Sequence, residues 1–405
     1  MVHAAQQFIE RPQAMEWLRR WRNRDVIKVV TGIRRCGKST VLALAQQELL
    51  RDGTPKNAII SLDIEKMAFD APKTAKELYD LVVSQIKAQT NYVFIDEVQR
   101  VPEFEKAVDA LFARDDVDLY ITGSNSDLLS SELATLLTGR YVELTMLPLS
   151  FAEYRSAFPQ ELSDEELFNR YLIFGGMPYT AALPESDVSD YLDGVLSTIL
   201  VKDVSLRHPR FNMMAIRSLA AFLADNIGNR YSLKTIANGL SRNGIKISPT
   251  TVGEYLDALS ESYIVFEAKL YDAKSKTLLT QGGKYYLGDL GFRHLLLGRD
   301  QSNLGRRVEN VVYLELLRRN RNVFVGRSGE AEIDFVAEGD QGTCYYQVAL
   351  SVLDENTLAR ELASLQSLSD NYPKTLLTLD RIGTGDFNGI RHVNLIDWLL
   401  GREGA

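Results

Sequence analysis

A glycine-framed segment of the sequence could bind the phosphates of a nucleotide. Gly32 and Gly37 enclose GIRRCGKS, which matches the pattern G-x-x-x-x-G-K-[ST]. Glycines let backbone N–H groups approach a phosphate without a Cβ in the way, and a helix that begins here points its positive end at the same anion. Lys38 would reach the β- and γ-phosphates, Ser39 would ligate Mg²⁺, and Thr40 would lie beside the α-phosphate. The predicted cradle comprises Gly32, Ile33, Arg34, Arg35, Cys36, Gly37, Lys38, Ser39 and Thr40.

The segment YVFIDE ends an apolar run with two carboxylates. An unpaired charge is costly to bury, so two acids at this point need a reason. Asp96 would hold the magnesium through water, and Glu97 would polarise the water that attacks the phosphate. The two patterns together predict hydrolysis of ATP with Mg²⁺, and not binding alone.

A weaker signal follows in YITGSNS. Ser124 and Asn125 come after another apolar run, where a polar side chain could orient the attacking water. Gly-Ser-Asn also forms ordinary turns, so this segment fits either interpretation.

Apolar, β-rich runs must position these residues. VIKVVTG, NAIISLDI, YVFIDEV, VDLYITGS and RYVELTML alternate with segments whose apolar residues recur at helical spacing. Continuous apolar strands separated by helices are typical of a parallel sheet that is covered on both faces. The pattern predicts an α/β domain over residues 1–150.

The remainder of the chain reads as three further parts. Helical patterning dominates residues 151–215. Residues 216–275 resemble a winged helix, with two helices, a Gly-containing turn and a two-strand wing. Residues 276–405 return to alternating strands and helices. Winged helices read DNA or make only protein contacts, and both outcomes fit this segment.

Composition narrows the class of protein. The 405 residues exceed one ordinary core, and 45% hydrophobic with 25% charged residues is typical of a soluble globular protein. No apolar run reaches the length of a membrane span, the amino end lacks a signal-peptide pattern, and two cysteines are too few for a disulfide framework. We therefore expect a cytoplasmic protein without a membrane partner.

The net charge of -8 argues against a protein that is basic all over, but residues 202–246 hold eight Lys and Arg against two Asp. This local excess fits a phosphate-binding surface or a solvated basic face.

The motifs GIRRCGKST, FIDEVQ, ITGSNS, TGRYVELTMLPLSFAEY and FGGMP resemble a family of prokaryotic AAA-type ATPases. Its members join such a module to a winged helix and a carboxy-terminal domain that resembles restriction endonucleases. The resemblance covers nearly the whole chain. It implies the sheet order 5-1-4-3-2, a homo-oligomer with ATP at the subunit boundary, and an arginine finger from the neighbouring subunit. Arg140 is the candidate finger, and Arg34, Arg35 and Arg100 are its rivals.

Nucleases of the restriction type carry an acid on a helix, an Asp on a strand and E-x-K on the next strand. Glu309 and Asp334 match the first two positions, but Gln347 and Ala349 stand at the third. No lysine occurs between Lys284 and Lys374, so a replacement would be an arginine or come from elsewhere in the chain. We expect a nuclease-like fold that does not cut. The arginines that could still bind nucleic acid, or only complement a helix end, are Arg306, Arg307, Arg318, Arg319 and Arg321.

The sequence thus predicts a magnesium-dependent ATPase whose nucleotide state controls a contact with DNA or with a protein partner. Two alternatives remain open. One is an ATP-gated, metal-dependent nuclease that acts in defence, and the other is a module that uses ATP only to assemble.

Overall fold

The computed structural model describes residues 8–124, 139–298 and 302–402. The chain forms two compact units. Unit 1 comprises Met1–Leu147 and the short segment Glu261–Tyr263, and unit 2 comprises Pro148–Ser260 and Ile264–Ala405. The finer division into four domains stays a prediction.

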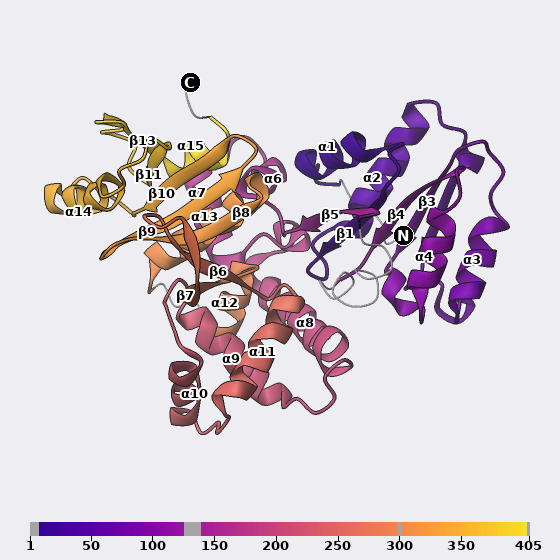
Figure 1. The fold of residues 1–405 in the computed structure, drawn as a ribbon, viewed down its shortest axis with the longest axis horizontal. Coiled ribbons are helices and arrows are strands. Elements are labelled where there is room, and N and C mark those ends of the chain that lie inside the picture. Colours follow the sequence, from indigo (N-terminus) through magenta and orange to yellow (C-terminus); the bar gives the residue numbers. More distant parts are fainter. Residues whose placement is uncertain (1–7, 125–138, 299–301, 403–405) are drawn as a thin grey trace. The chain divides into compact units, whose positions relative to one another are not determined.

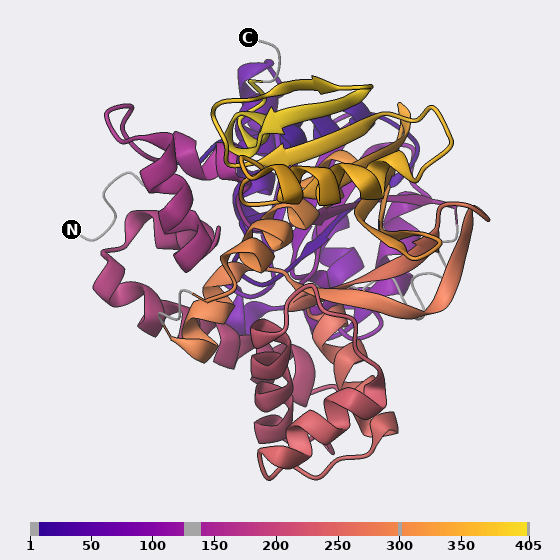
Figure 2. The same cartoon turned by 90° about the vertical axis from the view of Figure 1, so that its left-hand side faces the viewer.

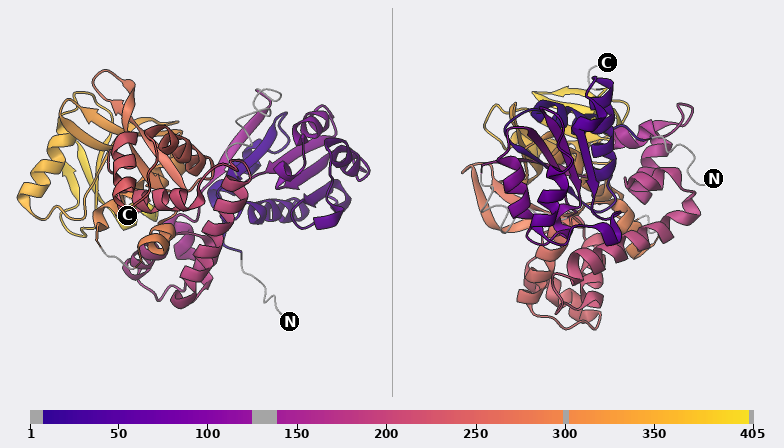
Figure 3. Two further views of the ribbon diagram at one scale, coloured as in Figure 1. Left: turned by 90° about the horizontal axis from the view of Figure 1, so that it is seen from below. Right: turned by 90° about the vertical axis from the view of Figure 1, so that its right-hand side faces the viewer.

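Unit 1 is built on a five-stranded sheet in which every neighbouring pair is parallel. Its strand order is β2-β3-β4-β1-β5, so the predicted order 5-1-4-3-2 is confirmed. Figure 3 shows this sheet from two further sides. The strands are β1 (Ile27–Gly32), β2 (Ile59–Asp63), β3 (Asn91–Asp96), β4 (Val117–Thr122) and β5 (Tyr141–Met146).

Helices cover both faces of this sheet (Figure 1). Alternate strand residues such as Val93 and Ile121 pack with Leu78 and Val108 of α3 and α4 in one apolar cluster. On the other face Phe94 and Tyr120 stack with ring centroids 4.6 Å apart, next to α1 and α2. The helices are α1 (Pro12–Trp21), α2 (Lys38–Arg51), α3 (Ala75–Val83) and α4 (Phe104–Phe112), with short turns η1 (Lys56–Ala58), η2 (Ala68–Asp70) and η3 (Val98–Arg100).

The carboxyl ends of β1, β3 and β4 meet at one edge of the sheet. Val30 of β1 lies opposite Thr122 of β4, and Asp96 of β3 lies opposite Asp63 of β2. Parallel pairing therefore brings the start of GIRRCGKS close to the ends of FIDE and ITGS, although the three segments are separated by dozens of residues in the sequence.

Unit 2 begins with helices. Three of them, α9, α10 and α11, lie together at the lower end of Figure 2. The helices up to residue 261 are α6 (Phe151–Ser156), α7 (Asp164–Phe174), η5 (Pro178–Ala182), α8 (Glu185–Thr198), the π-helical turn η6 (Ile199–Ser205), α9 (Met213–Asp225), α10 (Leu233–Arg242) and α11 (Pro249–Glu261).

A mixed eight-stranded sheet forms the rest of unit 2, in the order β12-β13-β11-β10-β9-β8-β6-β7. Its strands are β6 (Val265–Asp272), β7 (Thr277–Leu287), β8 (Asn322–Ser328), β9 (Ala331–Gly339), β10 (Gly342–Val348), β11 (Lys374–Thr378), β12 (Gly385–Phe387) and β13 (Ile390–Asn394). The helices after β7 are α12 (Leu290–Leu297), α13 (Leu304–Arg319), α14 (Glu355–Gln366) and α15 (Leu395–Leu399).

The hairpin β6–β7, which follows α11, belongs to this sheet. Residues Leu270–Asp272 of β6 pair in parallel with Val325–Arg327 of β8. The strands that the sequence suggests as a wing therefore form one edge of the larger sheet.

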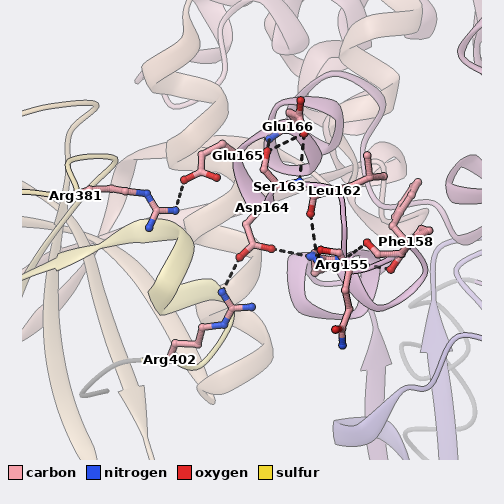
Figure 4. A network of polar contacts seen from close by, with 11 residues as sticks. Arg155, Phe158, Leu162, Ser163, Asp164, Glu165, Glu166, Arg381 and Arg402 are labelled. Carbon is pink, nitrogen blue, oxygen red and sulfur yellow. Dashed lines mark hydrogen bonds and ion pairs between the residues drawn. The ribbon is translucent and has the colours of Figure 1, made fainter.

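A polar network joins α7 to the end of the chain within unit 2 (Figure 4). Asp164, the first residue of α7, accepts hydrogen bonds of 2.6 Å from Arg155 and of 2.6 Å from Arg402. Arg381 pairs with Glu165 beside it. These arginines pair with carboxylates of the same unit, so we interpret the network as one that stabilises the fold of unit 2.

Candidate functional site

The loop between β1 and α2, residues 33–37, has the backbone of an anion cradle. Gly32 has φ 137° and Gly37 has φ 106°, a region that side chains rarely tolerate. A Cβ on Gly32 would also lie 2.1 Å from the carbonyl oxygen of Met146 on β5. Gly37 caps α2 without a side chain, which leaves the first amides of the helix to an anion. Both glycines are therefore needed for the shape of this loop.

Lys38 is folded onto the β1–α2 loop. Its ammonium group donates hydrogen bonds to the carbonyl oxygens of Gly32 (2.8 Å) and Ile33 (3.3 Å), and only 4% of the residue is exposed. Carbonyl oxygens are neutral acceptors, so an arriving phosphate offers this cation a stronger partner at the same place.

Arg11 anchors the β1–α2 loop by hydrogen bonds to backbone carbonyl oxygens, a role that sequence reasoning missed. Its guanidinium group donates to the carbonyl oxygens of Cys36 and Leu147, each at 2.7 Å, and the residue is buried. A single arginine ahead of a helix-starting proline gives no such signal in a sequence, because its partners are 25 and 136 residues away.

Asp96 and Glu97 lie at the carboxyl end of β3, as predicted, and both are buried. Asp96 accepts a hydrogen bond from the Thr122 hydroxyl group, and the Ser39 hydroxyl group lies near enough to lower its pKa. Ser39 and Asp96 thus lie close together where the sequence places a magnesium site. Thr122, whose hydroxyl also accepts from the Glu97 amide at 3.0 Å, is a residue that sequence reasoning missed. The signal available was a polar side chain at the end of an apolar strand.

The two adjacent carboxyl groups differ in acidity. Burial raises the pKa of Asp96, the negative charge of Glu97 raises it further, and the bonds from Ser39 and Thr122 offset this only in part. Burial alone would also raise the pKa of Glu97, but the Lys38 ammonium and the Ser124 hydroxyl group outweigh it, so the pKa of Glu97 is lowered.

Oxygen donors at Ser39 and Asp96 fit Mg²⁺, which prefers hard oxygen ligands and is usually held by one or two carboxylates together with substrate phosphates and water. In the described ranges, no group of three or more His, Cys, Asp and Glu side chains could hold a metal ion. A magnesium ion here would therefore depend on the phosphates of the ligand for part of its coordination.

Ser124 lies at the site, since its hydroxyl group donates to the Glu97 carboxylate. Asn125 lies outside the described residues. Of the two polar side chains predicted after β4, the structure thus describes one, and that one contacts Glu97.

Arg140 lies at the opposite edge of the sheet. It directly precedes β5, whose Tyr141 pairs with Ile27 at the start of β1. This places it roughly 20 Å along the strands from Gly32. Its guanidinium group pairs with Asp109 of α4 at 2.7 Å and is 52% exposed.

The rival arginines lie elsewhere in unit 1. Arg34 and Arg100 both face Glu65, the former at 3.7 Å, while Arg35 is exposed and has φ 70°.

The carboxy-terminal residues singled out by the sequence also gather, around a lysine. The Lys284 ammonium of β7 lies 3.0 Å from the Glu309 carboxylate and 2.7 Å from that of Glu332. Tyr286 donates to Glu309 at 2.6 Å. Burial alone would lower the pKa of Lys284, but Glu309, Asp334 and Glu332 outweigh it and raise the pKa. Lys284 of β7 thus supplies the cation that pairs with Glu309 and Glu332.

Gln347 is held at both ends of its amide. The Asp334 amide N–H donates to its oxygen at 3.3 Å, and its nitrogen donates to Glu361 of α14 at 2.9 Å. Burial, with the charge of Glu309, raises the pKa of Asp334 well above its ordinary value, and Lys284 opposes this only in part.

Two of the arginines named as nucleic-acid ligands make internal contacts. Arg318 donates to Glu315 and to the carbonyl oxygen of Pro148, and Arg319 donates to Glu315 and lies 4.2 Å from the ring centre of Trp398. For Arg318 and Arg319 the structural interpretation therefore holds.

Comparison with known proteins finds two matching domain families along the chain. Residues 24–155 match the AAA domain family, and residues 165–303 match a domain of unknown function, DUF8612. An uncharacterized protein of Haemophilus influenzae is 34% identical over 397 residues, which cover 97% of this chain and 98% of that protein. The chain belongs to this family of AAA-domain proteins. A second member, an uncharacterized protein of Methanocaldococcus jannaschii, is 32% identical over 345 residues, 78% of this chain and 75% of that protein.

The AAA-domain assignment includes the β1–α2 loop and the end of β3. A Walker-type ATPase of Pyrococcus abyssi has a similar fold, with a TM-score of 0.52 and 17% identity, covering 72% of this chain and 97% of that one. At this identity the likeness concerns the fold. Among the helices described here, none combines the length and apolar character needed to cross a membrane.

Proposed function

We propose that the protein binds ATP at the β1–α2 loop and hydrolyses it with the help of Mg²⁺. The observation that carries this proposal is the arrangement at the β1–α2 loop, where the buried Asp96 lies near the Ser39 hydroxyl group and the Lys38 ammonium contacts the carbonyl oxygens of Gly32 and Ile33. It brings the first turn of α2, which would bear the phosphates, close to the buried carboxylate that would hold the metal. A glycine-rich turn without a ligand has no need of this arrangement.

Each side chain then has a defined task. The Lys38 ammonium exchanges the carbonyl oxygens of Gly32 and Ile33 for phosphate oxygens. Ser39 would ligate the ion and Asp96 would hold it through water, and the ion would neutralise phosphate charge. Glu97 accepts a proton from the water that attacks, and its lowered pKa keeps it ionised for this purpose.

Calorimetric titration with ATP and Mg²⁺ tests the first step. We expect the parent protein to bind ATP. Lys38→Ala should lose at least about 100-fold in affinity, because it lacks the ammonium group that would pair with the phosphates. Lys76→Ala is the matched control, since Lys76 of α3 is exposed and pairs only with Asp80 among the contacts described. Equal heats for the parent and Lys38→Ala would contradict the proposal.

We further propose that Arg140 acts on the ATP of a neighbouring copy. Its position at the amino edge of the sheet supports this, because the loop of its own subunit lies at the other edge. Mixing two inactive variants tests it. Glu97→Gln retains Arg140, and Arg140→Ala retains the rest of the site, so a mixture should regain hydrolysis if the arginine works between subunits. A mixture as slow as its components, or a fully active Arg140→Ala, would contradict the assignment.

The nucleotide state, we propose, controls a contact of residues 202–246 with DNA or a protein. The basic excess of this segment supports a phosphate-binding surface, although Arg217 pairs with Asp193 and Arg230 with Glu332. The ATPase rate, measured with and without duplex or single-stranded DNA across a salt series, separates the two partners. Stimulation that falls steeply with salt indicates phosphate contacts, and a flat response favours a protein partner.

The nuclease alternative finds little support at the carboxy-terminal cluster. Lys284 and Gln347 already engage its carboxylates, and no three of the described acids converge on a metal position. We expect plasmid DNA to stay intact with the protein, ATP and either Mg²⁺ or Mn²⁺. Cutting that Asp334→Ala abolishes would contradict this expectation.

A further inference from the structure

Gln99 contacts the carboxylate that the proposed reaction uses. It lies in η3, the short turn that follows β3, and its side-chain nitrogen donates to Glu97 Oε2 at 2.6 Å. Ser124 donates to the other oxygen, Glu97 Oε1. The Glu97 carboxylate is thus held at both oxygens, from β4 on one side and from its own turn on the other.

The contact fixes which end of the Gln99 amide faces Glu97. An ionised carboxylate only accepts hydrogen bonds, so the NH₂ end must point at it. The amide oxygen, Gln99 Oε1, then points away from Glu97. It is buried and has no hydrogen-bond partner among the residues that the structure describes. A buried acceptor without a donor costs about 1–3 kcal/mol, so its retention next to a reactive carboxylate calls for a reason.

The backbone holds Gln99 firmly in this place. Glu97 starts the turn with φ 56°, its carbonyl oxygen accepts from Arg100 N–H at 3.1 Å, and the Val101 N–H donates to Val98 at 3.0 Å. Val98, between Glu97 and Gln99, is fully buried in the core of unit 1. The backbone on both sides of Gln99 is therefore fixed, and the hydrogen bond to Glu97 directs its half-buried side chain.

We propose that Gln99 is a positioning residue for the attacking water, which donates one O–H to Glu97 and the other to the unpaired Oε1 of Gln99. With both hydrogens directed away, a lone pair of the water faces the γ-phosphorus. The water oxygen bonds to that phosphorus, the bond to the oxygen bridging the β- and γ-phosphates breaks with its electrons staying on ADP, and the proton passes to Glu97. ATP and water thus give ADP, phosphate and a proton.

This inference rests on the proposed ATPase function, and the variant Gln99→Met tests it separately. Methionine matches glutamine in length but neither donates nor accepts strongly. We expect kcat to fall about 10- to 100-fold, because a misplaced nucleophile costs up to about that factor, while KM and the affinity for ATP change little. The melting temperature should change little, since removal of the unpaired oxygen offsets the loss of the hydrogen bond to Glu97. A residue with only a structural role would lower stability and affinity together.

Three further variants sharpen the test. Gln99→Asn keeps the amide but withdraws it by one methylene, so a partial loss of kcat is expected. In the Glu97→Gln background, Gln99→Met should have almost no further effect, because the two residues act on one water. Gln46→Met is the matched control: Gln46 is a glutamine of the same unit whose amide donates to Ser61 instead, at 3.1 Å.

The outcomes distinguish two failures. If the parent protein does not hydrolyse ATP, the proposed function fails and this inference with it. If the parent hydrolyses ATP, Glu97→Gln does not, and Gln99→Met keeps the parental kcat, only the assignment of Gln99 is overturned.

Discussion

Lys38 and Lys284 are two buried lysines that lie beside more than one carboxylate, and they differ in the groups that each ammonium contacts. Lys38 of unit 1 hydrogen-bonds to two backbone carbonyl oxygens, close to Asp96 and Glu97. Lys284 of unit 2 is ion-paired with Glu309 and Glu332. Each lysine is almost completely buried.

The difference teaches how a ligand site is told from a structural one. Neutral carbonyl oxygens give up a cation to a phosphate at small cost, whereas buried ion pairs that break leave an uncompensated charge. The helix terminus beside Lys38 also adds amide donors that no side chain caps. The first cluster is therefore prepared for a ligand, and the second is already neutralised from within.

We expect the largest effect from a substitution in the first cluster, that of Lys38, Asp96 and Glu97. Glu97→Gln should lower kcat for ATP hydrolysis by about 10²–10⁴-fold, since an amide cannot take the proton of water. Affinity for ATP should change far less, which comparison of calorimetry with steady-state rates will show. If a cellular function survives this block, ATP serves assembly and its hydrolysis is dispensable.

We expect the next largest effect from a substitution in the second cluster, that of Lys284, Glu309 and Glu332. Lys284→Met should destabilise the protein by about 3–5 kcal/mol, because the Glu309 carboxylate, only 15% exposed, loses the cation that pairs with it. Denaturant unfolding measures this loss, and Lys269→Met, at an exposed position of β6, should change stability by less than about 0.5 kcal/mol. The affinity of unit 1 for ATP should be retained. A mild effect at Lys284 would mean that the cluster is not held together by this charge.

A further buried carboxylate, that of Asp289, sharpens the comparison, because backbone amides hold it. Asp289 accepts hydrogen bonds from Gly176 N–H at 2.7 Å and from Gly291 N–H at 2.8 Å. Burial raises its pKa from an ordinary value of 3.8 to about 7, against the effect of those amides and of Arg318.

The folded state therefore binds the Asp289 proton more tightly than the unfolded state does. The protonated Asp289 carboxyl group therefore stabilises the folded state at low pH, and this contribution is lost as pH rises from about 4 to about 7. Asp289→Asn should remove this slope and cost about 1–3 kcal/mol at low pH, since one backbone N–H loses its acceptor. Denaturant unfolding of both proteins across this pH range measures the difference, and identical slopes would show that Asp289 does not titrate in this window.

Local patterns were sufficient to predict much of unit 1. Apolar strands separated by helical segments, and the spacing from Gly32 to Ser39, need no distant partner to be recognised. Parallel strands covered by helices then allow only one common edge for the motif-bearing ends, so the meeting of Ser39 with Asp96 could be anticipated.

The supporting contacts could not be anticipated. Arg11 reaches Leu147 across 136 residues, and Gln99 matters because of the carboxylate that its turn brings within 2.6 Å. Lys284 lies 25 residues before Glu309 and on another element, where no motif directs attention to it.

The sequence by itself determined which residue types stand at the ends of the strands, and with them the chemistry of phosphate and water. Only the tertiary structure decided which lysine is held by replaceable carbonyl oxygens and which is locked by carboxylates. The physical reason is that residue type and spacing act through local backbone geometry, whereas the partner of a buried charge is chosen by packing between elements that are far apart in the chain.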